Sequence, residues 1–425
     1  MIKSLKYTFV CCLLGFALFN DCTAPKESYS SKENLYKKNN LEIAAKFLAY
    51  HISDSLTQIY FTISNENFLY KRPDTSGYFY SATKVKYFLY AYAKAKQLLD
   101  SGSVTLFDRQ TENVNVRNLT GSLFSKCRTG QGYVCDLWIY DLNKKTRTPF
   151  VIEIDKTSSS TRQSFLIQRT NGTVIYDYNL VNGDTAIIKS FLNTASDFTV
   201  DYFKNEFPLP PPPFSNFERG SFNYKPDSSF TVSRAFGILK LIVPPKGFYH
   251  IVTDKVSKNG LTLFSVDASF PGIKNETEMI KSTRYITTSQ EYNTLLEAEN
   301  KKLAIDKFWQ EKGGSNERAK ELIRKYYSRV QQANKLFTSY QPGWQTDRGM
   351  IYVVFGPPTT MFKYANNEVW IYGNEAQPGA IRFTFVKVIN PFTDNDFSLD
   401  RNEIYKYSWY MAVTGWKDGH LTFDN

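Results

Sequence analysis

Short alternating or apolar runs, separated by turn residues, occupy most of residues 41–207 and constrain the fold more than any other feature of the sequence. Residues 59–63 and 150–154 are such runs, and Asn171-Gly172 and Asn182-Gly183 are typical of tight turns between strands. Aromatic residues make up 16% of the chain, which favours pleated, half-buried surfaces. We therefore predict a mainly β protein that begins with an immunoglobulin-like β-sandwich over residues 41–207.

The first 21 residues have the pattern of a secretory signal peptide. Lys3 and Lys6 precede an apolar run, residues 7–19, that is too short to span a bilayer. A buried helix at the start of a cytosolic fold is the alternative, but the charged start and the polar tract after the run both fit export. No run of 18 apolar residues occurs in the chain, which excludes a polytopic membrane protein. We predict that residues 1–21 direct export.

Cys22 stands where the modified cysteine of a bacterial lipoprotein would stand. The polar stretch that begins there, residues 22–40, would form a flexible tether. The residues just before Cys22 are not the small ones that usually precede such a cysteine. Cleavage after Ala24 is the alternative, and Pro25 would then follow the cleaved bond. We predict a lipid anchor at Cys22, in a protein associated with the outer membrane of a bacterial cell envelope.

Cys127 and Cys135 flank a turn-like stretch, residues 128–132. In an oxidising envelope they could form a disulfide, which for so short a loop would stabilise the fold by roughly 2 to 3 kcal/mol. Two buried free thiols are the alternative. We expect no metal site here, because two cysteines without a neighbouring His or Cys pair cannot supply four ligands.

Five prolines between residues 208 and 213 interrupt the β pattern. Such a run favours polyproline II, a semi-rigid spacer, so we interpret residues 208–213 as a linker between domains. A docking segment for a proline-binding partner is the alternative. Residues 214–283 are then predicted to form a smaller β domain.

From residue 284 onwards the apolar residues recur at helical spacing. Thr288 followed by Glu291 is typical of a capping box, which marks the start of a helix. Residues 350–355 are apolar on both faces, and we predict that they form a central strand of a sheet. Helices followed by a small antiparallel meander make residues 284–425 an α+β domain.

The stretch from Gly343 to Gly349, with the residues after it, carries the most specific pattern in the chain. The positions that form this pattern are Gly343, Trp344, Thr346, Asp347, Arg348, Gly349, Ile351, Tyr352, Gly356, Pro357 and Pro358. They resemble the GWxTD domain, a family of bacterial envelope proteins that are often lipoproteins. Thr359 departs from the family pattern, in which an acidic residue is usual. The resemblance covers residues 220–390 approximately and implies export, with β-sandwich regions ahead of the motif, but no established reaction.

This motif could be structural or could form an active site. Adjacent residues of an extended chain point to opposite sides, so Asp347 and Arg348 would not readily face one substrate together. Trp344 beside a glycine is also what a buried contact between helix and sheet requires. We therefore predict a structural, non-catalytic motif, made of Gly343, Trp344, Thr346, Asp347, Arg348, Gly349, Gly356, Pro357 and Pro358.

The rest of the sequence offers little for catalysis. It contains no nucleophile elbow, zinc-binding His-Glu-x-x-His pair, phosphate loop or dinucleotide fingerprint, and we predict no cofactor and no metal. The net charge is +11, and residues 301–335 contribute ten basic and four acidic residues to it. In an exported protein this balance favours anionic lipid, a glycan or an acidic partner over nucleic acid, and a solvated helix face is the alternative.

We predict a non-catalytic cell-envelope lipoprotein that acts as an assembly or interaction module for other envelope proteins. One alternative is a glycan- or peptide-binding protein whose aromatic platforms are drawn from Trp344, Trp370, Trp409 and Trp416. The other is a hydrolase whose catalytic carboxylates come together only on folding.

Overall fold

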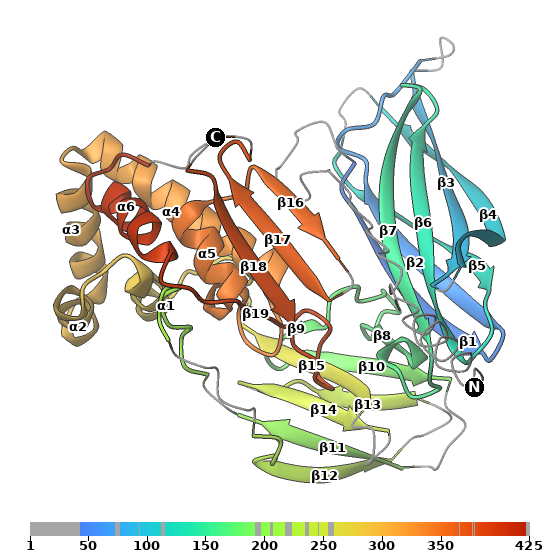
Figure 1. The fold of residues 1–425 in the computed structure, drawn as a ribbon. Coiled ribbons are helices and arrows are strands. Elements are labelled where there is room, and N and C mark those ends of the chain that lie inside the picture. The colour runs from blue at the N-terminus through green and yellow to red at the C-terminus, as the bar shows by residue number, and fades with distance from the viewer. Residues whose placement is uncertain are drawn as a thin grey trace, which may run out of the picture.

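The computed structural model describes residues 43–421, apart from residues 73–76, 93, 112–114, 192–196, 205–206, 217–222, 234–237, 245, 254–258, 365, 376 and 378. The predicted signal peptide, the tether and Cys22 therefore lie outside the described residues. The chain forms two β-sandwiches and a C-terminal unit of helices packed on a sheet, placed side by side (Figure 1). The fold is mainly β with an α+β C-terminal part, as the alternating runs and the later helical spacing predict.

The first sandwich is built from β1 (Ala45–Ser53), β2 (Leu56–Ser64), β3 (Phe79–Ala91), β4 (Lys94–Gln110), β5 (Asn118–Lys126), β6 (Gln131–Asp141) and β7 (Thr146–Lys156). One sheet has the order β1-β2-β5 and the other β4-β3-β6-β7, with antiparallel pairing throughout. The chain thus changes sheets between β2 and β3, and again on either side of β5, which is the Greek-key connection of immunoglobulin-like sandwiches. Alternate residues of β2 and β3 are buried between the sheets, as the period of a strand requires.

Cys127 and Cys135 are free thiols inside this sandwich, so the predicted disulfide is not formed. Cys135 lies in β6 within the core, and the Sγ atom of Cys127, just after β5, lies 2.9 Å from the Thr57 Oγ1 atom. Burial raises the pKa of both thiols. The stretch between the cysteines is not a closed hairpin: β5 belongs to one sheet and β6 to the other, which separates the two positions.

The second sandwich follows a short 3₁₀ helix, η1 (Arg162–Ser164), and contains β8 (Phe165–Gln168), β9 (Asn179–Val181), β10 (Thr185–Ser190), β11 (Asp197–Phe203), β12 (Ser228–Ser233), β13 (Ile238–Ile242), β14 (Phe248–Val252) and β15 (Gly260–Val266). Its sheets have the orders β8-β10-β13 and β12-β11-β14-β15-β9. Both sheets contribute to one apolar core, which includes Phe198, Leu241 and Leu263.

The proline run does not separate two domains, contrary to the prediction. β10 pairs with β13 and β11 pairs with β12 and β14, so strands from both sides of residues 208–213 alternate in the same sheets. The boundaries predicted at 207 and 214 are therefore wrong, and the first sandwich ends near Lys156 instead. The reason is that β8 to β11 cannot bury their apolar faces without the strands that follow the prolines.

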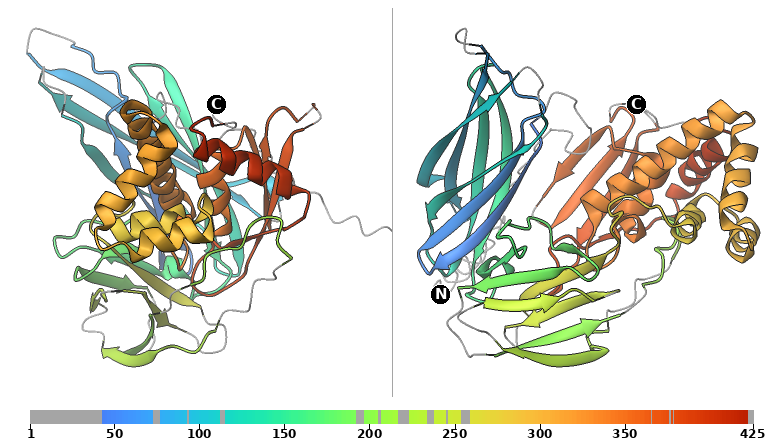
Figure 2. Two further views of the ribbon diagram at one scale, coloured as in Figure 1. Left: turned by 90° about the vertical axis from the view of Figure 1, so that its left-hand side faces the viewer. Right: turned by 180° about the vertical axis from the view of Figure 1, so that it is seen from behind.

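The C-terminal unit contains the helices α1 (Glu276–Ser282), α2 (Ser289–Glu297), α3 (Lys301–Gly313), α4 (Asn316–Phe337), α5 (Asp347–Phe355) and α6 (Tyr405–Lys417), with the 3₁₀ turns η2 (Thr283–Tyr285) and η3 (Gly343–Gln345). Its sheet has the order β16 (Thr360–Lys363), β17 (Asn367–Tyr372), β18 (Ile381–Lys387) and β19 (Phe397–Leu399). α4 and α5 lie along one face of this meander, as two further views show (Figure 2). The predicted capping box at Thr288 and Glu291 is confirmed at the start of α2.

Residues 350–355 form most of α5 and not the central strand that their apolar character predicts. Every residue of α5 is buried, because the helix packs against α4, the sheet and α6. A short run of apolar residues is equally compatible with a buried helix and a buried strand, so the run alone could not decide. Among the described residues, no helix is both long enough and apolar enough to cross a membrane.

Candidate functional site

The motif begins with two glycines that bring separate backbone segments into contact. A Cβ atom on Gly343 would lie 2.0 Å from the Ala333 carbonyl oxygen of α4. A Cβ atom on Gly349 would lie 1.8 Å from the Gly343 carbonyl oxygen. Real Cβ atoms never come this close to backbone atoms, so only glycine permits η3, α4 and the first turn of α5 to pack together here.

Thr346 joins η3 to α5 as the N-cap of the helix. Its Oγ1 atom accepts a hydrogen bond from the Gly349 backbone N–H at 3.0 Å and donates one to the Gly343 carbonyl at 2.7 Å. The first bond satisfies one of the backbone N–H groups that a helix start leaves without a partner. Thr346 therefore holds the turn and the helix in one geometry.

Trp344 is 1% exposed and packs in the core of the C-terminal unit. Its backbone N–H donates to the Asn334 Oδ1 atom at 3.2 Å, and its carbonyl accepts from the Tyr285 hydroxyl at 2.9 Å. The indole meets the Tyr285 ring edge-on, with 6.1 Å between the ring centroids. Trp344 thus joins α4 to η2.

Asp347 uses its carboxylate to bind the far end of the meander. Its Oδ2 atom accepts from the Leu399 backbone N–H at 2.9 Å and from the Arg401 guanidinium at 3.2 Å, and Oδ1 forms an ion pair with the same guanidinium. Arg401 also donates to the Pro211 carbonyl at 3.1 Å. The motif is therefore connected through Arg401 to the proline segment of the second sandwich.

Arg348 is the most enclosed charge of the motif, with 2% exposure. Its guanidinium forms an ion pair with Glu368 of β17 at 3.1 Å and donates to the Asn395 carbonyl at 3.0 Å. It also lies over the ring of Phe397, 4.1 Å from the centroid, and faces Phe337 of α4 at 5.1 Å. One side chain thus joins α5 to two strands, a loop and α4.

The far end of α5 is closed by Gly356 and by Arg329 of α4. Gly356 has a φ of 86°, a conformation that favours glycine, and a Cβ atom there would lie 2.6 Å from the Arg329 guanidinium. Arg329 donates to the carbonyls of Val353 and Val354, the acceptors that a helix end leaves free. Burial lowers the pKa of Arg329 to about 10, so it stays charged at neutral pH. Pro357 and Pro358 follow and lead into β16.

The motif therefore uses its polar groups inside the protein. Thr346, Asp347 and Arg348 are each bonded to named partners, and Asp347 and Arg348 are 6% and 2% exposed. Trp344, Trp370, Trp409 and Trp416 are all 5% exposed or less, because they fill the core between the helices and the meander. None of the four can serve as the surface platform that the glycan-binding alternative requires.

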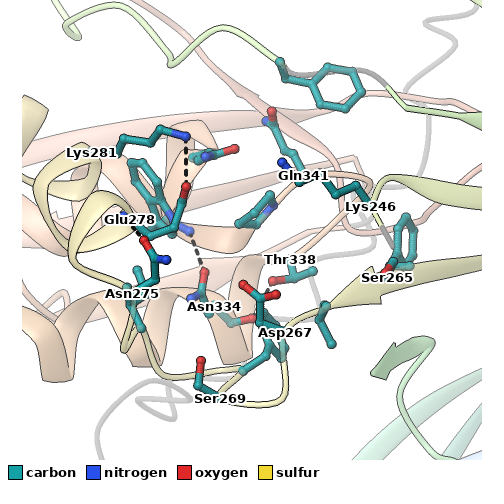
Figure 3. Close-up of a pocket in the computed structure, with 18 of the residues that line it drawn as sticks. Lys246, Ser265, Asp267, Ser269, Asn275, Glu278, Lys281, Asn334, Thr338 and Gln341 are labelled. Atoms are coloured by element: carbon teal, nitrogen blue, oxygen red, sulfur yellow. Dashed lines mark hydrogen bonds and ion pairs between the residues drawn. The ribbon is translucent and has the colours of Figure 1, made fainter. Parts of the chain in front are cut away.

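A cavity of about 460 Å³ lies next to the motif, between the second sandwich and the C-terminal unit (Figure 3). We call it the junction cavity. One wall comes from β15 and the loop that leads to α1, and the opposite wall from residues 338–345, including the buried edge of Trp344. Lys204, Phe207 and Leu209, which lie before and within the proline segment, complete it. Its size is within the range of ligand-binding pockets.

Hydrogen bonds hold both walls of the junction cavity in place. Asn334 of α4 donates to the Pro271 carbonyl at 2.9 Å on one wall and accepts from Trp344 on the other. The Thr338 hydroxyl accepts from the Gly343 backbone N–H at 3.0 Å. Asn275 caps α1 by accepting from the Glu278 N–H at 3.2 Å. No local sequence signal could have indicated this site, because its residues come from distant segments of the chain.

Residues 247–418 match the family model of the GWxTD domain. The chain contains a GWxTD domain. The match starts at Gly247, before β14, whereas the sequence pattern predicts a domain that starts at residue 284. No curated protein matches the chain.

The GWxTD domain extends across both the second sandwich and the C-terminal unit. It includes β14 and β15 of the second sandwich, together with the helices and the meander. All residues that line the junction cavity fall within it except Lys204, Phe207, Leu209 and Lys246. The cavity is therefore almost entirely a feature of the GWxTD domain itself.

Proposed function

We propose that this protein is a non-catalytic component of the bacterial cell envelope, exported by residues 1–21, anchored through Cys22 and acting as an interaction module for other envelope proteins. One observation supports a non-catalytic role. The two charged residues of the motif form ion pairs inside the fold, Asp347 with Arg401 and Arg348 with Glu368. A catalytic group has to touch its substrate, and these groups have no free side to do so.

The arrangement of the three units also supports an interaction role. The GWxTD domain and the second sandwich share an aromatic cluster made of Phe203, Phe248, Phe264, Tyr340 and Phe392. Arg401 and Asn402 add hydrogen bonds to the carbonyls of Pro211 and Pro213. Domains that are packed together in this way can present their surfaces in a defined geometry, which favours binding because little order has to be gained.

Acyl labelling tests the anchor. Cells that express the full chain are fed an alkyne fatty acid, and we expect label on the wild type and on Cys127→Ser, which changes a buried thiol, but not on Cys22→Ser. Unchanged labelling of Cys22→Ser would contradict the anchor.

Affinity isolation after mild detergent extraction tests the interaction role. We expect defined envelope proteins to be recovered in stoichiometric amounts with the wild-type chain. Recovery of a monomer that instead binds purified glycans would overturn the proposal.

The hydrolase alternative can be tested at the junction cavity. Asp267 and Glu278 both line the junction cavity, but the Glu278 carboxylate is paired with Lys281 at 2.9 Å. Two carboxyl groups that act as general acid and general base need environments that give them different pKa values, and both must be accessible to the substrate. Turnover of glycosides that is lost in Asp267→Asn would favour this alternative over ours.

A further inference from the structure

Three large apolar side chains lie exposed at one end of the first sandwich. Phe107 of β4 is 80% exposed, Leu142 in the turn after β6 is 45% exposed and Leu69 is 42% exposed. Ala82 of β3 lies between two of them, because it pairs with Phe107 and its carbonyl accepts from the Leu142 backbone N–H at 2.9 Å. The Leu69 backbone N–H donates to the carboxylate of Asp141, the residue before Leu142, at 2.8 Å. Large apolar side chains gathered at the surface are typical of a contact with another molecule or with a membrane.

Basic residues border this apolar row on both sides. Arg109 and Lys71 lie on one side, because both pair with Tyr80 of β3. Lys84 and Arg147 lie on the other side, where both pair with the same residue of β6. Residues two positions apart on a strand point to the same face, so these four side chains share the outer face of the sheet with the phenylalanine of the apolar row.

Few carboxylates can neutralise these basic side chains. The described residues of this end are 65–72, 77–84, 105–111, 115–118 and 140–148. The cations among them that form no ion pair with a described residue are Lys71, Lys84, Arg109, Lys144, Lys145 and Arg147. Asp108 and Asp141 are 3% and 1% exposed and are bonded inside the sandwich, and Glu66 is the one exposed carboxylate in these ranges. We call the surface formed by Leu69, Phe107, Leu142 and the six cations the cationic tip.

The chain enters the first sandwich at this same end. Ile43 is the first described residue, and the carbonyl of the next residue, Ala44, accepts from the Ser64 backbone N–H at 2.8 Å where β2 ends. Asn65 follows β2 and donates to the carboxylate of Asp108 at 3.3 Å, directly after the exposed phenylalanine of β4. The stretch that precedes Ile43 therefore joins the fold beside the cationic tip.

The proposed anchor would keep the cationic tip close to a membrane. Residues 22–42 lie outside the described residues, and the sequence predicts a flexible tether for most of this stretch. A flexible chain of this length has a root-mean-square end-to-end distance of about 25 Å. A lipid-modified Cys22 would thus hold the end of the sandwich that carries the cationic tip within reach of the bilayer surface.

We propose that the cationic tip docks on the anionic surface of the membrane that holds the anchor. Phe107 and Leu142 enter the headgroup layer, and the six cations contact lipid phosphates. A bilayer surface supplies both negative charge and an apolar layer just beneath it. A soluble anionic glycan would match the cations but would leave Phe107 in water. The inference rests on the proposed function, because the anchor is what selects a membrane among the possible anionic partners.

Vesicle binding tests the docking. The chain from residue 22 carries Cys22→Ser, so that no acyl group contributes, and the bound fraction is measured by sedimentation. We expect binding to vesicles of phosphatidylethanolamine and phosphatidylglycerol in equal amounts, and much weaker binding to neutral phosphatidylcholine vesicles. Arg109→Glu/Arg147→Glu should lower the affinity for the anionic vesicles about tenfold or more, and Phe107→Ser/Leu142→Ser should lower it several-fold.

Matched controls come from the C-terminal unit. Lys320→Glu reverses an exposed charge on α4, and Tyr407→Ser removes a ring on α6 that is 75% exposed. Both variants should bind vesicles as the Cys22→Ser chain does. Urea denaturation of every variant checks that these changes at exposed positions leave the fold intact.

An environment-sensitive fluorophore separates insertion from simple attraction of charges. The fluorophore NBD is attached to the new thiol of Phe107→Cys or, as a control, of Tyr407→Cys. Cys127 and Cys135 are buried and should react little. On anionic vesicles we expect the emission at position 107 to rise and shift to shorter wavelength, and the emission at position 407 to stay unchanged.

Two results would overturn the proposal. One is equal vesicle binding by the Cys22→Ser chain with and without Arg109→Glu/Arg147→Glu. The other is unchanged emission at position 107 in the presence of anionic vesicles. If the tip then binds dextran sulfate, its partner is a soluble polyanion and not a membrane.

The outcome is distinguishable from a failure of the proposed function. If Cys22 takes up the acyl label but the unacylated chain does not bind vesicles through the tip, the anchor stands and the docking falls. If Cys22 takes up no label, the anchor falls, and vesicle binding at the tip decides the docking by itself.

Discussion

The first sandwich and the GWxTD domain both bury a carboxylate beside an arginine, but water has different access to the two pairs. In the first sandwich Asp108 is almost fully buried, whereas its partner Arg117 has 53% of its side chain exposed. In the GWxTD domain the side chains of Arg348 and Glu368 are 3% and 1% exposed. Arg117 already faces water, whereas Arg348 and Glu368 are both enclosed by protein. The enclosed pair should therefore respond far more strongly to mutation.

The first prediction tests this difference directly. Arg348→Met removes the cation that is paired with the buried Glu368 carboxylate, so we expect the free energy of unfolding to fall by about 3 to 5 kcal/mol. Arg117→Met should cost much less. Urea denaturation followed by tryptophan fluorescence measures both, since five of the six tryptophans lie in the C-terminal unit and Trp138 lies in the first sandwich.

A double variant serves as the control for this prediction. Arg348→Met combined with Glu368→Leu removes both charges and should recover much of the lost stability, because the desolvated carboxylate is gone. Equal losses for Arg348→Met and Arg117→Met would show that the comparison between the two regions is wrong.

Two glycines, Gly349 in the GWxTD domain and Gly132 in the first sandwich, allow a second comparison of the two regions. Gly349→Ala would place a methyl group 1.8 Å from a backbone oxygen, and we expect a loss of about 3 kcal/mol, the upper end for overpacking. Gly132→Ala in the first sandwich would meet the ring of Tyr92, at 2.4 Å, and this ring is a side chain at the surface, 40% exposed, that can shift more easily than backbone. Urea denaturation should therefore show little change for Gly132→Ala. A larger loss for that variant than for Gly349→Ala would contradict the argument.

His51 makes the first sandwich sensitive to acid. Burial lowers its pKa to about 4, while its Nδ1 and Nε2 atoms bond to Thr57 and to the Asp155 carbonyl. Because the folded pKa is below the unfolded value of 6.5, the stabilisation is present above pH 6.5 and is lost as the pH falls towards 4. Between pH 8 and pH 5 the loss should be about 2 kcal/mol, or roughly thirtyfold in amide protection.

Hydrogen exchange measured by mass spectrometry tests this prediction, after correction for the intrinsic pH dependence of exchange. The decrease should appear in peptides from β1 and β2, which carry His51 and Thr57, and it should disappear in His51→Gln. An equal decrease in peptides from α4 and α5 would mean that another group is responsible.

The smallest predicted effect concerns the N-cap of α5. Thr346→Ala removes the acceptor of the Gly349 N–H bond and should cost about 1 kcal/mol of stability. Thr346→Ser keeps the hydroxyl and should recover most of the loss. If alanine and serine give the same stability in urea denaturation, the hydroxyl does not cap the helix in solution.

Residues 350–355 form a helix where a strand is predicted, and the residues on either side of them explain why. The apolar run alone suggested a strand, but Thr346 before it and Gly356 after it are typical start and stop signals of a helix. Capping is a local effect, so this part of the fold could have been predicted.

The junction cavity and the division into domains, in contrast, depend on contacts between distant parts of the chain. The proline segment lies between β11 and β12, and its contacts with Arg401 and Asn402 join positions about 190 residues apart. Ser339 and Lys246 line the same cavity only because folding brings the loop after α4 close to the segment before β14. No spacing rule along the chain reports such pairs.

Local sequence patterns were enough to predict the strands of the first sandwich, the helical character of residues 289–337 and the presence of the GWxTD motif. These depend on period, caps and a specific run of residues, which are local properties. Only the tertiary structure decided that strands on both sides of the prolines share one sandwich, and that Cys127 and Cys135 stay apart. It also decided that Asp347 and Arg348 face internal partners, because the energy of a buried charge depends on neighbours that only folding brings within reach.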